Sequence, residues 1–208
     1  MSHMKEGQEK IYYAYGDSVE KISLLPQVES VIGHGYEVLY LTEDIDEFAL
    51  QMLRTYDEKE FLNVCEENLD LASEEEKEKE KLKAENDASA EMFGFMKDSI
   101  GDNVSKVRFT NTLQNHPVSL SSEGNVSMGM EKILNKMPGT EEQHIKAEIV
   151  LEININHPLA AKLKELFEND KDKLATYSKI LFAQARLVSG MTLDNPAEIS
   201  SLVCDLML

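Results

Sequence analysis

Several features that identify common enzymes and membrane proteins are missing from this sequence of 208 residues. It has no GxxxxGK[ST] loop, no GxGxxG after a strand, no HExxH and no GxSxG, which are motifs of phosphate, dinucleotide, zinc and serine-hydrolase sites. The five histidines are scattered, without metal-ligand spacing. No apolar run approaches the ~20 residues of a membrane span, and no signal peptide opens the chain. We therefore predict no catalytic, cofactor or metal site, and no membrane span.

Basic residues and cysteines are also scarce. The 39 acidic residues outnumber the 21 basic ones, and the resulting net charge of -18 repels nucleic acids and anionic membranes. Cys65 and Cys204, the two cysteines, fit no CxxC spacing. This pattern is typical of reduced thiols in a cytoplasmic protein. We predict no nucleic-acid or membrane partner. The opening Met1 to Met4 is typical of residues left by cloning and is set aside.

The first third of the chain has the pattern of a small α/β unit. Ile11 to Tyr15 predicts a strand, and helical sequence interrupted at Pro26 follows it. Tyr36 to Leu41 (YEVLYL) is almost entirely apolar or β-favouring, which predicts a strand buried on both faces of a parallel sheet. Phe61 to Val64 is a candidate third strand. Alternating strands and helices favour a small parallel sheet.

An acid-rich helix start follows the YEVLYL strand. Thr42 is a candidate N-cap, and Asp44 and Asp46 suit the positive end of the helix dipole. The expected apolar face consists of Ile45, Phe48, Ala49, Met52 and Leu53. Paired acids also suit Mg²⁺, so a Mg²⁺-dependent phosphotransfer enzyme using Asp44 and Asp46 is one alternative function.

The middle of the chain is a charged stretch followed by β signals. Ser73 to Asp87 is charged almost throughout, which predicts a solvated helix that connects two units, with a disordered linker as the alternative. Further on, Ile145 to Ile155 keeps an unbroken alternation of apolar and polar residues. This pattern predicts a strand with one buried and one wet face, in an antiparallel sheet.

Two apolar surfaces suggest interactions. Between the β regions, a helical stripe over Val126 to Met137 is rich in methionine, which suits either a core helix or an adaptable surface for apolar partners. At the end of the chain, a helix over Asp172 to Val188 is followed by one that begins at Asn195, where Asn195 and Glu198 form a capping box. This helix pair suits packing within the chain or a four-helix bundle between two copies.

Four segments resemble, in the same order, motifs of the ninety-kilodalton heat-shock chaperones. Gly35 to Phe48 is similar to the family's GxEVLYLTDPIDEY, Tyr12 to Ser18 to YYITGES, Leu151 to Pro158 to LEINPxHP, and Ser189 to Pro196 to the turn before the last helix. Together they cover nearly the whole chain. Without the acidic tail of eukaryotic cytosolic members, the sequence resembles the bacterial branch.

The resemblance implies residue roles. Client contact would involve an amphipathic helix and one aromatic residue, namely Val126, Met130, Ile133, Met137 and Phe48. At Val126 the family often has methionine instead. Dimer contact would involve the last two helices, through Leu174, Leu181, Val188, Ile199, Leu202, Val203 and Leu206. The implied partners are a second copy of the chain and unfolded or partly folded clients.

The resemblance also implies a domain plan and a fold class. Residues 5–66 would end the family's middle domain, 67–91 would be a charged helical connector, and 92–208 would be the dimerisation domain. The expected fold is α/β, or α+β overall: a parallel α/β unit, then a mixed or antiparallel sheet with helices, and a helix pair in an intermolecular four-helix bundle. ATP and Mg²⁺ would bind only in the parent's N-terminal domain, so this chain would not hydrolyse ATP. The alternative is an acidic α/β interaction module without chaperone activity.

Overall fold

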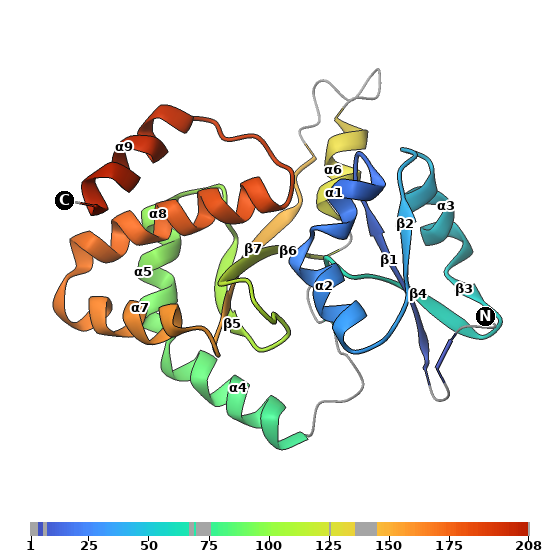
Figure 1. Ribbon diagram of the computed structural model, residues 1–208, viewed down its shortest axis with the longest axis horizontal. Coiled ribbons are helices and arrows are strands. Elements are labelled where there is room, and N and C mark those ends of the chain that lie inside the picture. Colours follow the sequence, from blue (N-terminus) through green and yellow to red (C-terminus); the bar gives the residue numbers. More distant parts are fainter. Residues whose placement is uncertain are drawn as a thin grey trace. The chain divides into compact units, whose positions relative to one another are not determined.

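The computed structural model describes residues 4–5, 8–66, 69, 76–124, 126–135 and 145–207. It has mixed α/β content (Figure 1) and two compact units. Unit 1 comprises residues 1–73 and 121–148, and unit 2 comprises 74–120 and 149–208. Unit 1 thus includes residues 121–148, which lie between the two segments of unit 2 in the sequence. None of the described helices is long and apolar enough to cross a membrane.

The sheet of unit 1 has the order β2-β1-β4-β3. Its strands are β1 (Lys10–Tyr15), β2 (Val38–Leu41), β3 (Thr55–Tyr56) and β4 (Lys59–Asn63). As predicted, β1 is parallel to both of its neighbours. The antiparallel edge strand β3 was not predicted. Its turn places Asp57 and Glu58 at positive φ, a conformation usually signalled by Asn or Gly.

Strand β2 corrects one prediction. It is parallel to β1 but lies at the edge of the sheet, and its Leu39 is 46% exposed. The YEVLYL run was expected to be buried on both faces. An apolar run reports β propensity and burial together, and it does not distinguish a central strand from an edge strand.

Two helices pack against β2 and enclose the core of unit 1, α1 (Val19–Ser23) and α2 (Pro26–Gly33). Helix α1 is capped by Ser18, and α2 begins with Pro26 at its first turn, where no backbone N–H is needed. Gly35 follows α2 at a φ of 79°, which a side chain would disfavour. The buried apolar core consists of Tyr12, Ala14, Ile22, Leu25, Val28, Val31, Val64 and Leu69.

Helix α3 (Asp46–Leu53) starts differently from the prediction. Its N-cap is Ile45, which has no side-chain capping bond, so Thr42 does not cap it. The helix start is instead tied by the backbone N–H of Glu43, which donates to Asp46 Oδ2 at 3.2 Å. Unit 1 also contains α6 (Met128–Leu134).

The second sheet has the order β5-β7-β6, formed by β5 (Lys106–Thr110), β6 (Val118–Glu123) and β7 (Glu148–Asn154). The predicted β7 strand exists, but it is parallel to β5, and its polar residues Glu152 and Asn154 are buried. The expected wet face is therefore found at Lys146 and Glu148, which are exposed, but not at Glu152 and Asn154. The elements that pack over a sheet decide whether its face is buried, and polar side chains on a covered face must be satisfied inside the protein.

The helices among the described residues of unit 2 are α4 (Glu76–Ala88), α5 (Ala90–Ile100), α7 (Pro158–Asn169), α8 (Lys171–Val188) and α9 (Pro196–Leu206). Helix α8 packs against α5, α7 and α9. The charged stretch is helical from Glu76 onward, as predicted, and it is anchored: the side chain of Asn86 bonds both the N–H and the C=O of Phe109 on edge strand β5, at 2.8 and 3.1 Å.

Candidate functional site

Helix α6 carries the stripe that the sequence assigned either to a core or to client contact. Ser127 caps it by accepting a hydrogen bond from the N–H of Met130 at 3.0 Å. Met130 is only 8% exposed and Ile133 is also buried, which favours the core interpretation for these two side chains. Val126 is half-buried, and Met137 lies outside the described residues.

Beneath α6 lies a cluster of three polar side chains, Glu47, Asn63 and Ser127, called here the Glu47 cluster. Glu47 Oε1 accepts hydrogen bonds from Ser127 Oγ at 2.6 Å and from Asn63 Nδ2 at 2.9 Å. The Glu47 side chain is fully buried, and Oε2 has no hydrogen-bond partner among the described residues. A glutamate in the first turn of a helix predicted only dipole stabilisation, so the sequence did not reveal this cluster.

The backbone of α6 approaches Glu47 closely because Gly129 has no side chain. A Cβ at this position would lie 2.6 Å from Glu47 Oε2 and 2.6 Å from the Tyr15 ring. Two further contacts hold the helix. Gln51 Nε2 lies 2.8 Å from the sulfur of Met130, and Lys132 forms an ion pair with Asp17.

The pKa values of Asp17 and Glu47, the two acids that contact α6, are shifted in opposite directions. Hydrogen bonds from Lys132 and Lys21 lower the pKa of Asp17 to about 2. Burial raises the pKa of Glu47, and the hydrogen bonds from Ser127 and Asn63 offset this only in part. Burial together with the nearby Glu47 also raises the pKa of Glu66. Unit 1 therefore holds one carboxyl with a lowered pKa, that of Asp17, and two with raised pKa values, those of Glu47 and Glu66.

Helix α3 presents much of its predicted apolar face to solvent. Met52 is 87% exposed, Ile45 and Leu53 are also exposed, and Phe48 is half-buried. The one buried residue of the helix is Glu47, because α3 packs against α6 through that side. Exposed apolar groups gathered on one helix mark a candidate interaction surface.

The acids considered for Mg²⁺ have partners within the chain. Asp44 Oδ1 accepts a hydrogen bond from the Tyr15 hydroxyl at 2.6 Å, and Asp46 accepts the Glu43 N–H. Among the described residues no group of three or more acidic, histidine or cysteine side chains is arranged to hold a metal ion. The two acids are thus used to fix the start of α3.

The C-terminal helices divide the expected dimer residues into two groups. Leu174 and Leu181 are buried within unit 2 itself, so their environment is the core of the protomer. Val188 is half-buried. Helix α9 has no buried residue, and its apolar stripe stays partly open to solvent along its length, at Ile199, Leu202, Val203 and Leu206.

Polar contacts fix the start of α9. Asn195 Oδ1 accepts the N–H of Glu198 at 3.2 Å, as the predicted capping box requires. The Glu198 carboxylate accepts a hydrogen bond from the Asn195 side chain at 3.1 Å, whereas a full capping box uses the backbone N–H of the N-cap residue. The preceding turn is held by Arg186, which binds Asp194 at 2.6 and 3.2 Å. The helix with the open apolar stripe is therefore a well-defined element.

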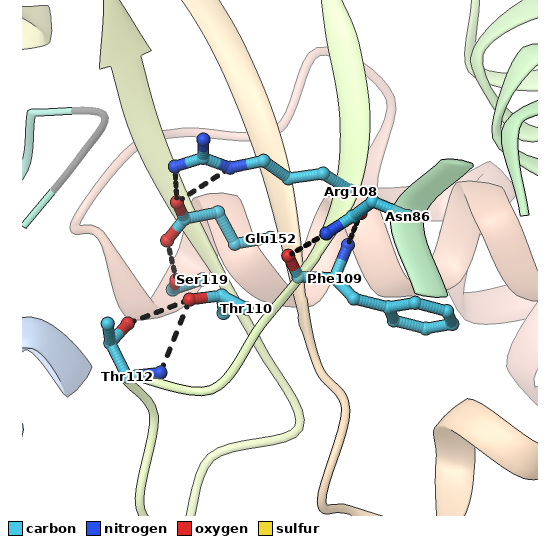
Figure 2. A network of polar contacts seen from close by, with 7 residues as sticks. All are labelled: Asn86, Arg108, Phe109, Thr110, Thr112, Ser119 and Glu152. Carbon is cyan, nitrogen blue, oxygen red and sulfur yellow. Dashed lines mark hydrogen bonds and ion pairs between the residues drawn. The ribbon is translucent and has the colours of Figure 1, made fainter. Parts of the chain in front are cut away.

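A buried ion pair supports the central strand of the second sheet (Figure 2). Arg108 on β5 contacts Glu152 Oε1 on β7 with two nitrogens, at 2.5 and 3.2 Å, and Ser119 Oγ donates to Glu152 Oε2 at 3.2 Å. Glu152 is 5% exposed. The parallel register that places Arg108 opposite Glu152 could not be read from the sequence.

Comparisons with known proteins agree on one family. The family model described as Hsp90 protein matches residues 1–208. The chain is 47% identical to the chaperone protein HtpG of Clostridium perfringens, 46% to HtpG of Shouchella clausii and 48% to HtpG of Clostridium botulinum, with all of the chain covered in each case. It spans about a third (32%) of the length of these relatives.

Proposed function

Because the chain belongs to the Hsp90 family, we propose that it is the C-terminal dimerisation and client-contact region of an ATP-dependent chaperone. The relatives named as chaperones support a role in protein folding. The finer assignment rests on the resemblance of the sequence motifs and on the surfaces of the two units.

The observation that carries the dimerisation role is the open apolar stripe of α9. An amphipathic helix normally buries its apolar side, yet α9 buries no residue within its own chain. A second α9 related by a two-fold axis would cover the stripe, with α8 completing a four-helix bundle. In this proposal Val188, Ile199, Leu202, Val203 and Leu206 meet the partner, while Leu174 and Leu181 support α8 from within the protomer.

Light scattering on a dilution series tests the dimer. We expect a mass near twice the 23.5 kDa of the chain that persists to micromolar concentration. A monomer of 23.5 kDa at all concentrations would contradict the proposed bundle, because the open stripe of α9 would then stay uncovered. Cross-linking through Cys204, which is exposed in α9, gives an independent check of which helices meet.

For client contact we propose the surface formed by α3 and α6. Phe48 is half-buried beside the exposed Met52, and Val126 precedes α6. Methionine and aromatic side chains adapt to many apolar partners, which suits a chaperone that binds unrelated chains. The proposed contact set is completed by Met130, Ile133 and Met137. Met130 and Ile133 are buried, so they become accessible only when α6 separates from α3.

Replacing Phe48 by alanine tests this surface. We expect about five- to tenfold weaker binding of several unrelated unfolded proteins, as the loss of a half-buried aromatic contact predicts. The matched control is Leu24→Ala, which removes an exposed apolar side chain of unit 1 outside α3 and should leave binding unchanged. Equal effects of both changes would contradict a client surface at α3.

The chemistry of the whole chaperone lies outside this chain in our proposal. The parent would bind ATP and Mg²⁺ in its N-terminal domain, and the chain described here would hydrolyse no ATP by itself. Its contribution is to hold two ATPase arms at one end, which raises their effective concentration for each other. We further propose that the protein works in the cytoplasm.

A further inference from the structure

Strand β5 lies at one edge of the second sheet, and helix α4 packs against it. The contact is made by the side chain of Asn86 (Figure 2). Its Oδ1 accepts the N–H of Phe109 at 2.8 Å, and its Nδ2 donates to the C=O of Phe109 at 3.1 Å. A residue of an added antiparallel strand would offer one C=O and one N–H to the same two backbone groups. Asn86 therefore takes the place of a further strand.

The edge of β5 is firmly held at Phe109. This side chain is 1% exposed, and its ring meets the ring of Phe93 edge to face, with 4.9 Å between the centroids. The Lys164 ammonium lies 5.1 Å from the centroid of the Phe109 ring. These contacts fix Phe109 from within unit 2, so its outward backbone groups should keep their geometry if α4 moves away. An edge strand with fixed, unpaired backbone groups is a template for pairing with another chain.

Among the described residues, little besides Asn86 attaches α4 to the rest of unit 2. Lys77 to Lys81 are exposed, and Leu82, the one large apolar residue of the helix, is half-buried. Glu85 forms an ion pair with Lys164 at 2.6 Å, but both side chains are partly exposed, which makes such a pair weak. A helix that is polar on nearly all sides gains little from packing. Detachment of α4 should therefore cost far less than unfolding of unit 2.

We propose that the outer edge of β5 is a strand-addition site for an extended segment of polypeptide, and that α4 is its removable cover. In the closed state Asn86 holds the N–H and C=O of Phe109. In the open state α4 turns away about Ser89, the residue between α4 and α5, and the bound segment takes over both hydrogen bonds. Backbone pairing accepts many sequences, so an unfolded client fits the site. Only this choice of natural ligand rests on the proposed function.

The charges at the site indicate which extended segments it favours. When α4 leaves, its Glu85 leaves too, and Lys164 loses the carboxylate that it binds in the closed state. An acidic side chain of the bound segment would replace Glu85, just as its backbone replaces the Asn86 amide. The favoured ligand is therefore an extended β-forming segment that carries a glutamate or aspartate.

Hydrogen exchange of the Phe109 amide in the full chain tests the cover. Asn86→Ala removes both bonds to Phe109, so exchange at this amide should rise about ten- to thirtyfold. The amide of Ile153 in the central strand β7 should stay protected, which shows that the sheet is intact. The control is Asn169→Ala, which removes an asparagine that bonds Glu165 within α7 and should leave Phe109 unchanged. Unchanged exchange at Phe109 in Asn86→Ala would overturn the cover.

Binding of a short peptide of alternating threonine and valine, with a glutamate at each end, tests the strand-addition site. Its dissociation constant should fall in Asn86→Ala by the factor by which Phe109 exchange rises, because both report the open fraction. The matched control is the same peptide methylated on alternate backbone nitrogens, which cannot donate those hydrogen bonds and should not bind. Equal binding of the two peptides would overturn pairing through the backbone.

The unchanged chain gives a second test that needs no substitution. Saturating peptide should slow exchange of the Phe109 amide and accelerate exchange of the α4 amides, because peptide and cover exclude each other. Bound peptide that leaves both rates unchanged would place its binding elsewhere and refute the site at β5.

The failure of this site and the failure of the proposed client surface are distinguishable. If the peptide binds at β5 and Phe48→Ala leaves client capture unchanged, the strand-addition site stands and the α3 surface is refuted. If Phe48→Ala weakens capture and the peptide binds neither Asn86→Ala nor the unchanged chain, the strand-addition site is refuted and the α3 surface stands.

Discussion

A chain with Leu202→Asp and Val203→Asp should be a monomer at concentrations at which the unchanged chain is a dimer. Both residues lie on the open stripe of α9, and a two-fold axis places each change twice in the interface. Four half-buried apolar side chains contribute about 3–6 kcal/mol to association, and unpaired carboxylates in their place add a desolvation cost. The dissociation constant should therefore rise by more than about a hundredfold.

The control variant places the same negative charges on the other side of α9. Ser200→Asp and Ser201→Asp alter two exposed residues of α9 and should leave the dimer intact. Analytical ultracentrifugation of both double variants over a concentration series is the measurement. Since α9 buries no residue in its own protomer, the stability of monomeric unit 2 should change little. A dimer that survives in the Leu202 and Val203 variant would place the interface elsewhere.

Arg108→Met should destabilise unit 2 by about 3 kcal/mol, the lower end of the range for breaking a buried ion pair. The Arg108 side chain is partly accessible, whereas the Glu152 side chain is almost fully buried. Without Arg108, the carboxylate of Glu152 keeps Ser119 as its remaining hydrogen-bond donor. We expect the thermal transition of unit 2 to fall by more than about 10 °C.

Two comparisons show whether the unpaired charge causes this loss. Arg108→Met combined with Glu152→Met should regain most of the stability, because apolar residues of similar volume can replace a buried ion pair. Lys162→Met, which breaks an exposed pair with Glu165, should leave the stability of unit 2 nearly unchanged. A double variant as unstable as Arg108→Met would show that the side chain of Arg108 acts through packing rather than through charge.

Local patterns in the sequence predicted much of the fold. The strand at Ile11 to Tyr15, the break at Pro26 and the capping box at Asn195 all lie where propensity and capping rules place them. The charged stretch is helical from Glu76 onward for the same reason. Such features depend on residues that are only a few positions apart, so they can be recognised in the sequence itself. The family resemblance is confirmed by the match over residues 1–208.

Features that depend on distant partners were not predictable in this way. The alternation in β7 suggested a wet face, and only the parallel register with β5 shows that Glu152 is buried against Arg108. The apolar residues of α3 defined one face of the helix, and only the tertiary structure shows that Glu47 is turned inward while Met52 is exposed. A periodic pattern defines the two faces of a helix or strand but not which element covers each face.

By itself, the sequence determined the fold class, the family and the positions of most helices and strands, because propensity, caps and motifs are local properties. Only the tertiary structure showed that the buried carboxyl of Glu47 bonds the first residue before α6, Ser127, and that the apolar stripe of α9 stays uncovered within its own chain. Burial depends on which surfaces meet after folding. The energy of a charged or apolar side chain depends in turn on burial, and so the candidate sites emerged from packing rather than from sequence motifs.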